Sequence, residues 1–279
     1  MNILELKKVN LIKNNGEILL ENVNLEVSPG EVILITGTNG IGKSTLFKAL
    51  KSFEGYSEEN YAIIDGEYIF DGDNSEKKEN LCCKIIDIHQ IEFYQEMRNF
   101  KETLMVAIPQ CIEKNKREQY LENWIETYKP FTKTEEDKYK SCADNEFIAT
   151  LKSFFSKEEV KGRSGGEEKY LSILEGLVRC DDPEIKLVLI DEPTNNLDHS
   201  HIKHLSDLIQ RIRHFRPELA FIIISHCHVW PYITKTYEIS NKKLIEVETE
   251  CHNCFGRADK DGYYNPIMNP NPQEVKTEE

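Results

Sequence analysis

The chain of 279 residues lacks the features that mark membrane-spanning and disulfide-stabilised secreted proteins. Its N-terminus has no apolar signal core, and its most apolar runs, around 187–190 and 221–224, are far shorter than the ~20 residues that span a bilayer. The eight cysteines occur singly or in pairs, without the spacing of a disulfide framework. We therefore expect reduced thiols in a cytosolic compartment, and any membrane role must come through another chain.

Excess positive charge is also absent. Asp and Glu total 49 against 35 Lys and Arg, which gives a net charge of −14 and disfavours a broad nucleic-acid footprint. One local basic groove stays compatible with this balance. Hydrophobic residues make up 39% of the chain and charged residues 30%, as is typical of a soluble globular protein with a substantial core.

What the chain does contain is a glycine-rich segment, 37–45, with the G-x-x-x-x-G-K-[ST] spacing of a phosphate-binding loop. An apolar run precedes it and helical spacing follows it. Glycines let backbone N–H groups point at phosphate oxygens, and the following helix aims its positive end at the same anion. We expect Lys43 to reach the β- and γ-phosphates of ATP and Ser44 to hold Mg²⁺. The predicted nucleotide-binding residues are Gly37, Thr38, Asn39, Gly40, Ile41, Gly42, Lys43, Ser44 and Thr45.

Strands and helices alternate along most of the chain, as the apolar periodicity indicates. Continuous apolar runs are typical of strands buried on both faces, and the helices between them imply an α/β fold with a parallel sheet. Residues 61–70, with Asp65-Gly66 between apolar flanks, predict a hairpin. The expected strand regions are 3–28, 32–36, 84–89, 186–190, 221–224 and 237–247.

Residues 91–162 differ from the rest because charge rises and helical patterns dominate. These patterns lie at 100–107, 112–128 and 147–155. We expect a helical subdomain inserted into a domain that spans residues 1–248. Residues 249–279 are rich in Pro, Asn and charge and are expected to form a loosely ordered tail.

Four further motifs stand at predicted strand or helix ends, beginning with Asp191-Glu192 after an apolar strand. Asp191 can hold Mg²⁺ through water, and Glu192 can orient or deprotonate an attacking water. Such a run can also be a simple junction between a strand and a turn.

The other three motifs each have a structural and a functional interpretation. Gln90, at a strand end, can contact Mg²⁺ or water, although a lone Gln is usually a solvated loop residue. His226 can donate a hydrogen bond to a γ-phosphate, although a lone His is more often structural. Ser164-Gly165-Gly166-Glu167 forms a capping box, and the same exposed helix start is a second phosphate site.

In this order the motifs resemble the ATP-binding-cassette (ABC) ATPase family, over roughly residues 3–248. The resemblance implies a P-loop NTPase core with a mainly parallel sheet, an N-terminal antiparallel β subdomain and an inserted α-helical subdomain. It also implies a head-to-tail dimer around two ATP molecules. The segments that carry it are 37–45, Gln90, 164–167, 187–192, Asn196-Leu197-Asp198 and His226.

The resemblance also implies residue roles. The catalytic residues are Glu192 as general base, Gln90 as sensor and His226 as switch. The Mg²⁺-binding residues are Ser44, Gln90 and Asp191. Residues 164–167 of one chain would cap the γ-phosphate held by Lys43 and Ser44 of the other, and Asp198 would couple the two sites.

Three features depart from the family pattern. Arg163 and Glu167 stand where the family motif usually begins with Leu and ends with Gln, which alters the interface electrostatics. No aromatic residue is found near Ile12-Lys13, so adenine would stack on Ile12 or on the Lys13 stem. The helical insert is longer than a minimal one, and partners usually dock there.

The resemblance leaves two main functional hypotheses. The first is the ATP-hydrolysing subunit of a membrane transporter, a homodimer held at the cytoplasmic side by a separate membrane-spanning polypeptide. The second is a soluble ABC ATPase that acts on a macromolecule, such as a translation factor or an iron–sulfur assembly ATPase. Residues 191–198 resemble the corresponding run in the translation factors. The translation factors carry two cassettes, whereas this chain has one. A catalytically idle module is disfavoured because all the chemical residues are present.

Cysteine and histidine pairs offer a separate hypothesis. Cys227-His228 and Cys251-His252-Asn253-Cys254 could together supply four zinc ligands. A lone C-x-x-C is a weak signal, so free reduced thiols are the favoured interpretation.

Overall fold

The computed structural model describes residues 1–13, 15–51, 62–72, 84–88, 100–109, 112–128, 165–194, 197, 199–225, 230 and 233–248. The strands are β1 (Leu4–Lys13), β2 (Ile18–Val27), β3 (Val32–Gly37), β4 (Ala62–Phe70), β5 (Ile85–Ile88), β6 (Leu187–Asp191), β7 (Ala220–Ile224), β8 (Lys235–Ser240) and β9 (Lys243–Val247). The helices are α1 (Lys43–Lys51), α3 (Phe100–Ala107), α4 (Arg117–Tyr128), α6 (Gly165–Val178) and α7 (His199–Phe215), with 3₁₀ turns η1 (Lys114–Lys116) and η2 (Arg179–Asp181).

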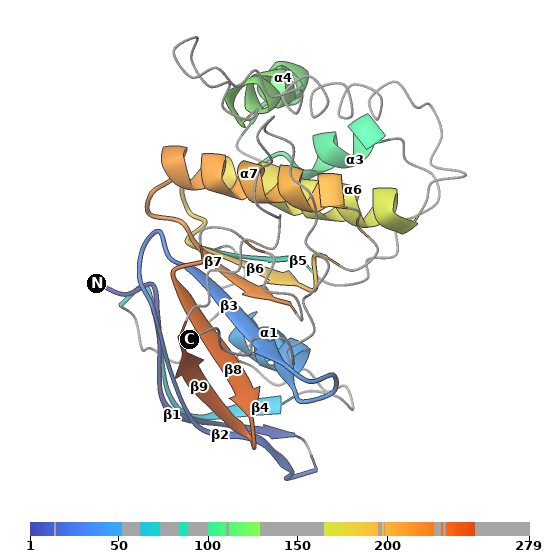
Figure 1. Cartoon of the computed structure of the whole chain (residues 1–279). Helices are drawn as coiled ribbons and strands as arrows, with labels where there is room; N and C mark the ends of the chain where they lie inside the picture. Colours follow the sequence, from blue (N-terminus) through green and yellow to red (C-terminus); the bar gives the residue numbers. More distant parts are fainter. Residues whose placement is uncertain are drawn as a thin grey trace, which may run out of the picture.

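Within these residues the strands form two sheets (Figure 1). The larger has the order β5-β6-β7-β3-β8-β9, in which the first five strands run parallel and β9 returns antiparallel to β8. The smaller is antiparallel, with the order β2-β1-β4. The expectation of an α/β fold with a mainly parallel sheet and an N-terminal antiparallel part is confirmed.

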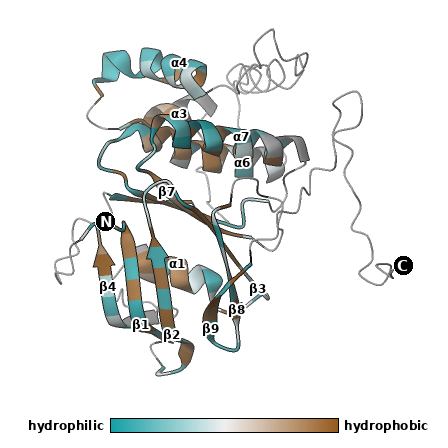
Figure 2. Cartoon of the chain, turned by 60° about the vertical axis from the view of Figure 1, so that its left-hand side comes forward, coloured by the Kyte–Doolittle hydropathy of each residue, from teal (hydrophilic) through white to brown (hydrophobic). Residues whose placement is uncertain are grey.

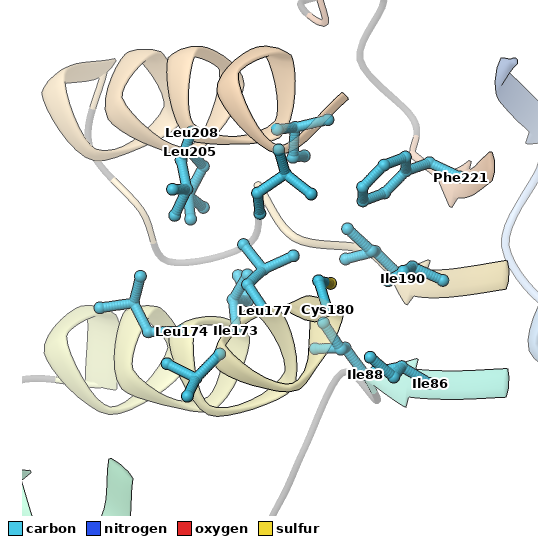
Figure 3. Close-up of a cluster of buried hydrophobic side chains, with 14 of the residues drawn as sticks. Ile86, Ile88, Ile173, Leu174, Leu177, Cys180, Ile190, Leu205, Leu208 and Phe221 are labelled. Atoms are coloured by element: carbon cyan, nitrogen blue, oxygen red, sulfur yellow. The ribbon is translucent and has the colours of Figure 1, made fainter. Parts of the chain in front are cut away.

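The parallel sheet separates two hydrophobic cores. In β3, Val32 and Leu34 face one core while Ile33 and Ile35 face the other, because successive side chains of a strand point to opposite sides. On the first side α6 and α7 pack on the sheet through residues such as Leu177 (Figure 3). On the second side lie α1 and the antiparallel sheet, whose strands alternate apolar and polar residues (Figure 2). Burial on both faces explains the continuous apolar runs.

The hairpin predicted at 61–70 is wrong. Residues 62–70 form the single strand β4, which pairs with β1 along its length. Gly66 has φ +130° beside Lys8 with φ +51°, at a shift in the pairing register. A Cβ on Gly66 would lie 2.8 Å from the Lys8 carbonyl oxygen, so the close approach of β1 requires glycine. The Asp65-Gly66 signal therefore marks a β-bulge instead of a turn.

Two predicted helices of the insert are present, and both lie on the side of the sheet that α6 and α7 cover (Figure 1). The helix predicted at 112–128 begins at Arg117, after the 3₁₀ turn. The Tyr120 and Tyr128 hydroxyls donate to the Asp181 carboxylate, which ties α4 to η2. The pattern at 147–155 lies outside the described residues. No helix in the part of the chain that the structure describes is long and apolar enough to cross a membrane.

Candidate functional site

Two of the predicted motifs meet at one edge of the parallel sheet, next to the end of a third strand. Segment 37–45 begins at the last residue of β3, Asp191 is the last residue of β6 with Glu192 directly after it, and Ser225 directly follows β7. Ile224 of β7 pairs with Ile35 on one side and with Asp191 on the other, so all three strands end at the same level. This is the edge at which open parallel sheets bind their ligands.

The segment 37–45 has the backbone of a phosphate cradle. Gly37, Gly40 and Gly42 have φ of +143°, +79° and +109°, which glycine adopts without strain. A Cβ on Gly37 would lie 2.9 Å from the Ile239 carbonyl oxygen, so glycine is also required there by space. Helix α1 begins at Lys43, and its N-terminus adds a favourable dipole for an anion.

Lys43 lies between the cradle and the acidic motif. Its Nζ donates to the carbonyl oxygens of Gly37 at 2.8 Å and Thr38 at 3.2 Å, and lies 3.9 Å from the Glu192 carboxylate. Burial lowers the Lys43 pKa, and the charges of Glu192 and Asp191 oppose that shift. In this position the Lys43 ammonium group lies beside both the glycine cradle and the Glu192 carboxylate.

Asp191 and Glu192 are both buried. The Glu192 N–H donates to the Ile224 carbonyl oxygen at 2.9 Å, and Glu192 has φ +46°, a left-handed conformation that costs a non-glycine residue about 1–3 kcal/mol. The Asp191 Oδ1 atom is buried and has no hydrogen-bond partner among the described residues. A buried carboxylate oxygen without a donor suits a hydrated cation, so the donor set fits Mg²⁺.

The other predicted site residues are placed only in part. Helix α6 begins at Gly165, so Gly165, Gly166 and Glu167 lie in its first turn. The Thr194 and Ser225 hydroxyls lie 3.3 Å apart and join the turn after β6 to the end of β7, one residue before His226. Gln90, Ser164, Asp198 and His226 lie outside the described residues, as do Cys227, His228, Cys251 and Cys254.

One buried residue at this site belongs to no predicted motif. Lys169 of α6 is buried, and its Nζ donates to the Asp191 carbonyl oxygen at 3.3 Å. The sequence offers a single signal for it, which is a lysine within the apolar pattern of an amphipathic helix.

Comparison with known proteins identifies the family. A family described as "ABC transporter" matches residues 20–195. A phosphonates import ATP-binding protein, PhnC, from Fusobacterium nucleatum subsp. nucleatum is 26% identical over 214 residues, which are 75% of this chain and 77% of that protein. The L-arabinose transport ATP-binding protein AraG from Geobacillus stearothermophilus is 28% identical over 213 residues, which are 74% of this chain and 35% of that protein.

Solved structures agree on the fold. The cbiO1 structure from Clostridium perfringens, part of the ABC transporter complex cbiONQ, aligns with a TM-score of 0.63 at 22% identity and covers 88% of this chain and 87% of its own. A structure titled as the ATP binding subunit of an ABC transporter aligns with a TM-score of 0.64 at 17% identity and covers 88% and 89%.

Proposed function

The chain belongs to the ABC transporter family, whose ATP-binding subunits are ATPases, and we propose that it drives a separate membrane-spanning partner by closing and reopening a dimer around two ATP. The observation that carries the proposal is the joint position of the glycine cradle, Lys43 and Glu192 at one sheet edge. Relatives named as import and transport ATP-binding proteins support a transporter subunit over the translation-factor alternative.

The chemistry proposed for this edge is hydrolysis of the γ-phosphoryl bond. The Lys43 ammonium binds the β- and γ-phosphate oxygens within the cradle. Glu192 takes a proton from a water whose oxygen attacks the γ-phosphorus, and the bond to the bridging oxygen of ADP breaks. Ser44 and Asp191 would hold Mg²⁺, which supplies charge neutralisation of the phosphates. Asp191 and Glu192 are both buried, so their carboxylates lie away from bulk water.

Four residues or segments complete the proposal from the family resemblance. Gln90 would sense Mg²⁺ and the attacking water, and His226 would contact the γ-phosphate. Residues 164–167 would cap the γ-phosphate bound by a second copy of the chain, in a head-to-tail homodimer, and Asp198 would couple the two sites. The support within this chain is that α6 begins at Gly165, so the backbone N–H groups of its first turn have no acceptor within the helix.

The proposed domain division also rests on the family resemblance. Residues 1–248 form the ATPase domain, 91–162 its helical insert and 249–279 a polar tail. Helices α3 and α4 of the insert share a hydrophobic core with α6, so a partner that docks on the insert would act on the helix that begins at the capping segment. The chain would then work at the cytoplasmic side of the membrane through that partner.

Replacing Glu192 by glutamine tests the dimer. Glu192→Gln removes the base while keeping the size of the side chain, so ATP with Mg²⁺ should trap a dimer that light scattering detects at twice the mass of the monomer. Glu184→Gln, on an exposed turn, is the matched control and should stay in the wild-type equilibrium. A Glu192→Gln variant that stays monomeric at saturating ATP would contradict the head-to-tail dimer.

Purification of the trapped variant from solubilised membranes tests the partner. A multi-span membrane protein identified in stoichiometric amount supports the transporter subunit. Recovery of ribosomes, or of soluble proteins alone, would instead support the soluble alternative.

A further inference from the structure

We infer that Lys169 is a positioning residue for Glu192, because it holds the carbonyl end of the peptide group that joins Asp191 to Glu192. This inference rests on the proposed role of Glu192 as general base. Lys169 lies outside the motifs of the nucleotide site and comes from α6, which covers the sheet from above in Figure 1.

The peptide group between Asp191 and Glu192 is held from both ends. Its N–H donates to the Ile224 carbonyl oxygen of β7 at 2.9 Å, and its carbonyl oxygen accepts from Lys169 Nζ at 3.3 Å. A peptide group is planar, so its two ends turn together about the chain axis. The two hydrogen bonds therefore restrain the orientation of this peptide plane, from which the φ angle of Glu192 is measured.

That φ angle is +46°, in a region that a glutamate occupies only when its surroundings impose it. Relaxation to negative φ would rotate the peptide plane and redirect the Glu192 side chain, which now lies 3.9 Å from Lys43. The buried ammonium of Lys169 opposes this rotation through its 3.3 Å hydrogen bond to the Asp191 carbonyl oxygen. The strained φ angle of Glu192 and the Lys169 hydrogen bond that restrains it thus occur at the same peptide group.

Helix α6 connects this restraint to the capping segment. Lys169 lies about one helical turn after Gly165, at which α6 begins. A helix moves as a rigid element over one turn, so a shift of its start displaces the Lys169 ammonium from the Asp191 carbonyl. Engagement of residues 164–167 by the second copy's ATP would in this way set the Glu192 geometry of the same chain.

The test compares Lys169→Met with Lys169→Arg in the full-length chain. Methionine keeps the apolar stem and loses the donor, so the single-turnover hydrolysis rate should fall about 10–100-fold, as expected for misplacement of a catalytic group. The dissociation constant for ATP, measured with Mg²⁺ chelated, should stay at the wild-type value. Arginine keeps the cation and should recover most of the rate.

Ser172→Ala is the matched control. Ser172 is a buried polar residue of the same helix, and its hydroxyl has no hydrogen-bond partner within the described ranges. This variant should hydrolyse ATP at the wild-type rate. Should Lys169→Met fail to fold, Lys169→Gln, with a polar end but no charge, replaces it and should show a smaller loss of rate.

Testing Lys169→Met in the Glu192→Gln variant distinguishes loss of positioning from general structural damage. With Glu192→Gln already present, adding Lys169→Met should cause no further loss of residual hydrolysis, because Lys169 acts through Glu192. An equal loss in both backgrounds, a wild-type rate for Lys169→Met, or a Lys169→Arg variant as slow as Lys169→Met would each overturn the inference. Wild-type hydrolysis by Glu192→Gln alone would instead refute the proposed role of Glu192.

Discussion

Two turns at the same sheet edge both require positive φ angles, but they place these angles on different kinds of residue. After β3, the positive φ angles fall on Gly37, Gly40 and Gly42, which accept them freely. After β6, the positive φ falls on Glu192, which accepts it only under strain. Both strands pair with β7, so the two turns face each other across one strand.

The difference follows from what each turn presents. In the proposed mechanism the turn after β3 offers backbone N–H groups to a phosphate, a role that needs no side chain at its glycines. In the same mechanism the turn after β6 presents the carboxylate of the general base, which glycine lacks, so the positive φ there falls on a strained residue. Contacts from Ile224 and Lys169 hold the second turn, whereas the first combines unstrained glycines with hydrogen bonds from Lys43.

Lys43→Met should have the largest effect, because Lys43 contacts both turns. Loss of the ammonium removes its charge-assisted contacts with phosphate and should weaken ATP binding by about 2–5 kcal/mol, which is at least about thirtyfold in Kd. Calorimetric titration with ATP measures this. Lys48→Met, at an exposed position of the same helix, is the control, and equal affinities for the two variants would contradict the assigned role of Lys43.

Gly37→Ala should have the next largest effect, on the free energy of unfolding. A Cβ at Gly37 would lie 2.9 Å from a backbone oxygen, whereas a Cβ at Gly40 would meet nothing within 4 Å. Gly37→Ala should therefore destabilise by about 3 kcal/mol and Gly40→Ala by about 1 kcal/mol. Urea unfolding measures both, and similar values would show that space around the first turn is unimportant.

Replacing Glu192 by glycine or alanine measures the strain in the second turn directly. Both variants lose the general base, so both should be inactive. Glycine accepts φ +46° and should leave the chain about 1 kcal/mol more stable than alanine does, against the usual order of these residues. If urea unfolding instead finds the alanine variant more stable, the turn carries no strain.

The smallest expected effect is on the pH dependence of the free energy of unfolding. Burial lowers the Lys43 pKa below its ordinary value, so the folded state binds fewer protons than the unfolded state between the lowered pKa and about 10.5. Unfolding free energy should therefore rise with pH in that window, and this contribution is lost below the lowered pKa. Lys43→Met should lack the rise, and identical pH profiles for the two proteins would contradict it.

The contrast between the turns also explains what the sequence could predict. Glycine spacing and a lysine make the first turn recognisable, and continuous apolar runs such as 187–190 predict the buried strands. The φ angle of Glu192 has no such signal, because contacts from β7 and α6 impose it. The sequence predicts a turn at Gly66, where the structure has a bulge, for a related reason: Asp-Gly signals a positive φ but not whether the chain reverses there.

The pairing of β3 has a consequence for the order of assembly. Val32 in β3 donates to Thr234, 202 residues further along the chain, and β3 lies between β7 and β8, which are both late strands. Contacts of such sequence separation form slowly, because a long loop must close first. During synthesis, the strand that carries the nucleotide loop therefore waits without its neighbours until nearly the whole domain has emerged. A chain released before β7 would retain the motif but not the sheet that shapes it.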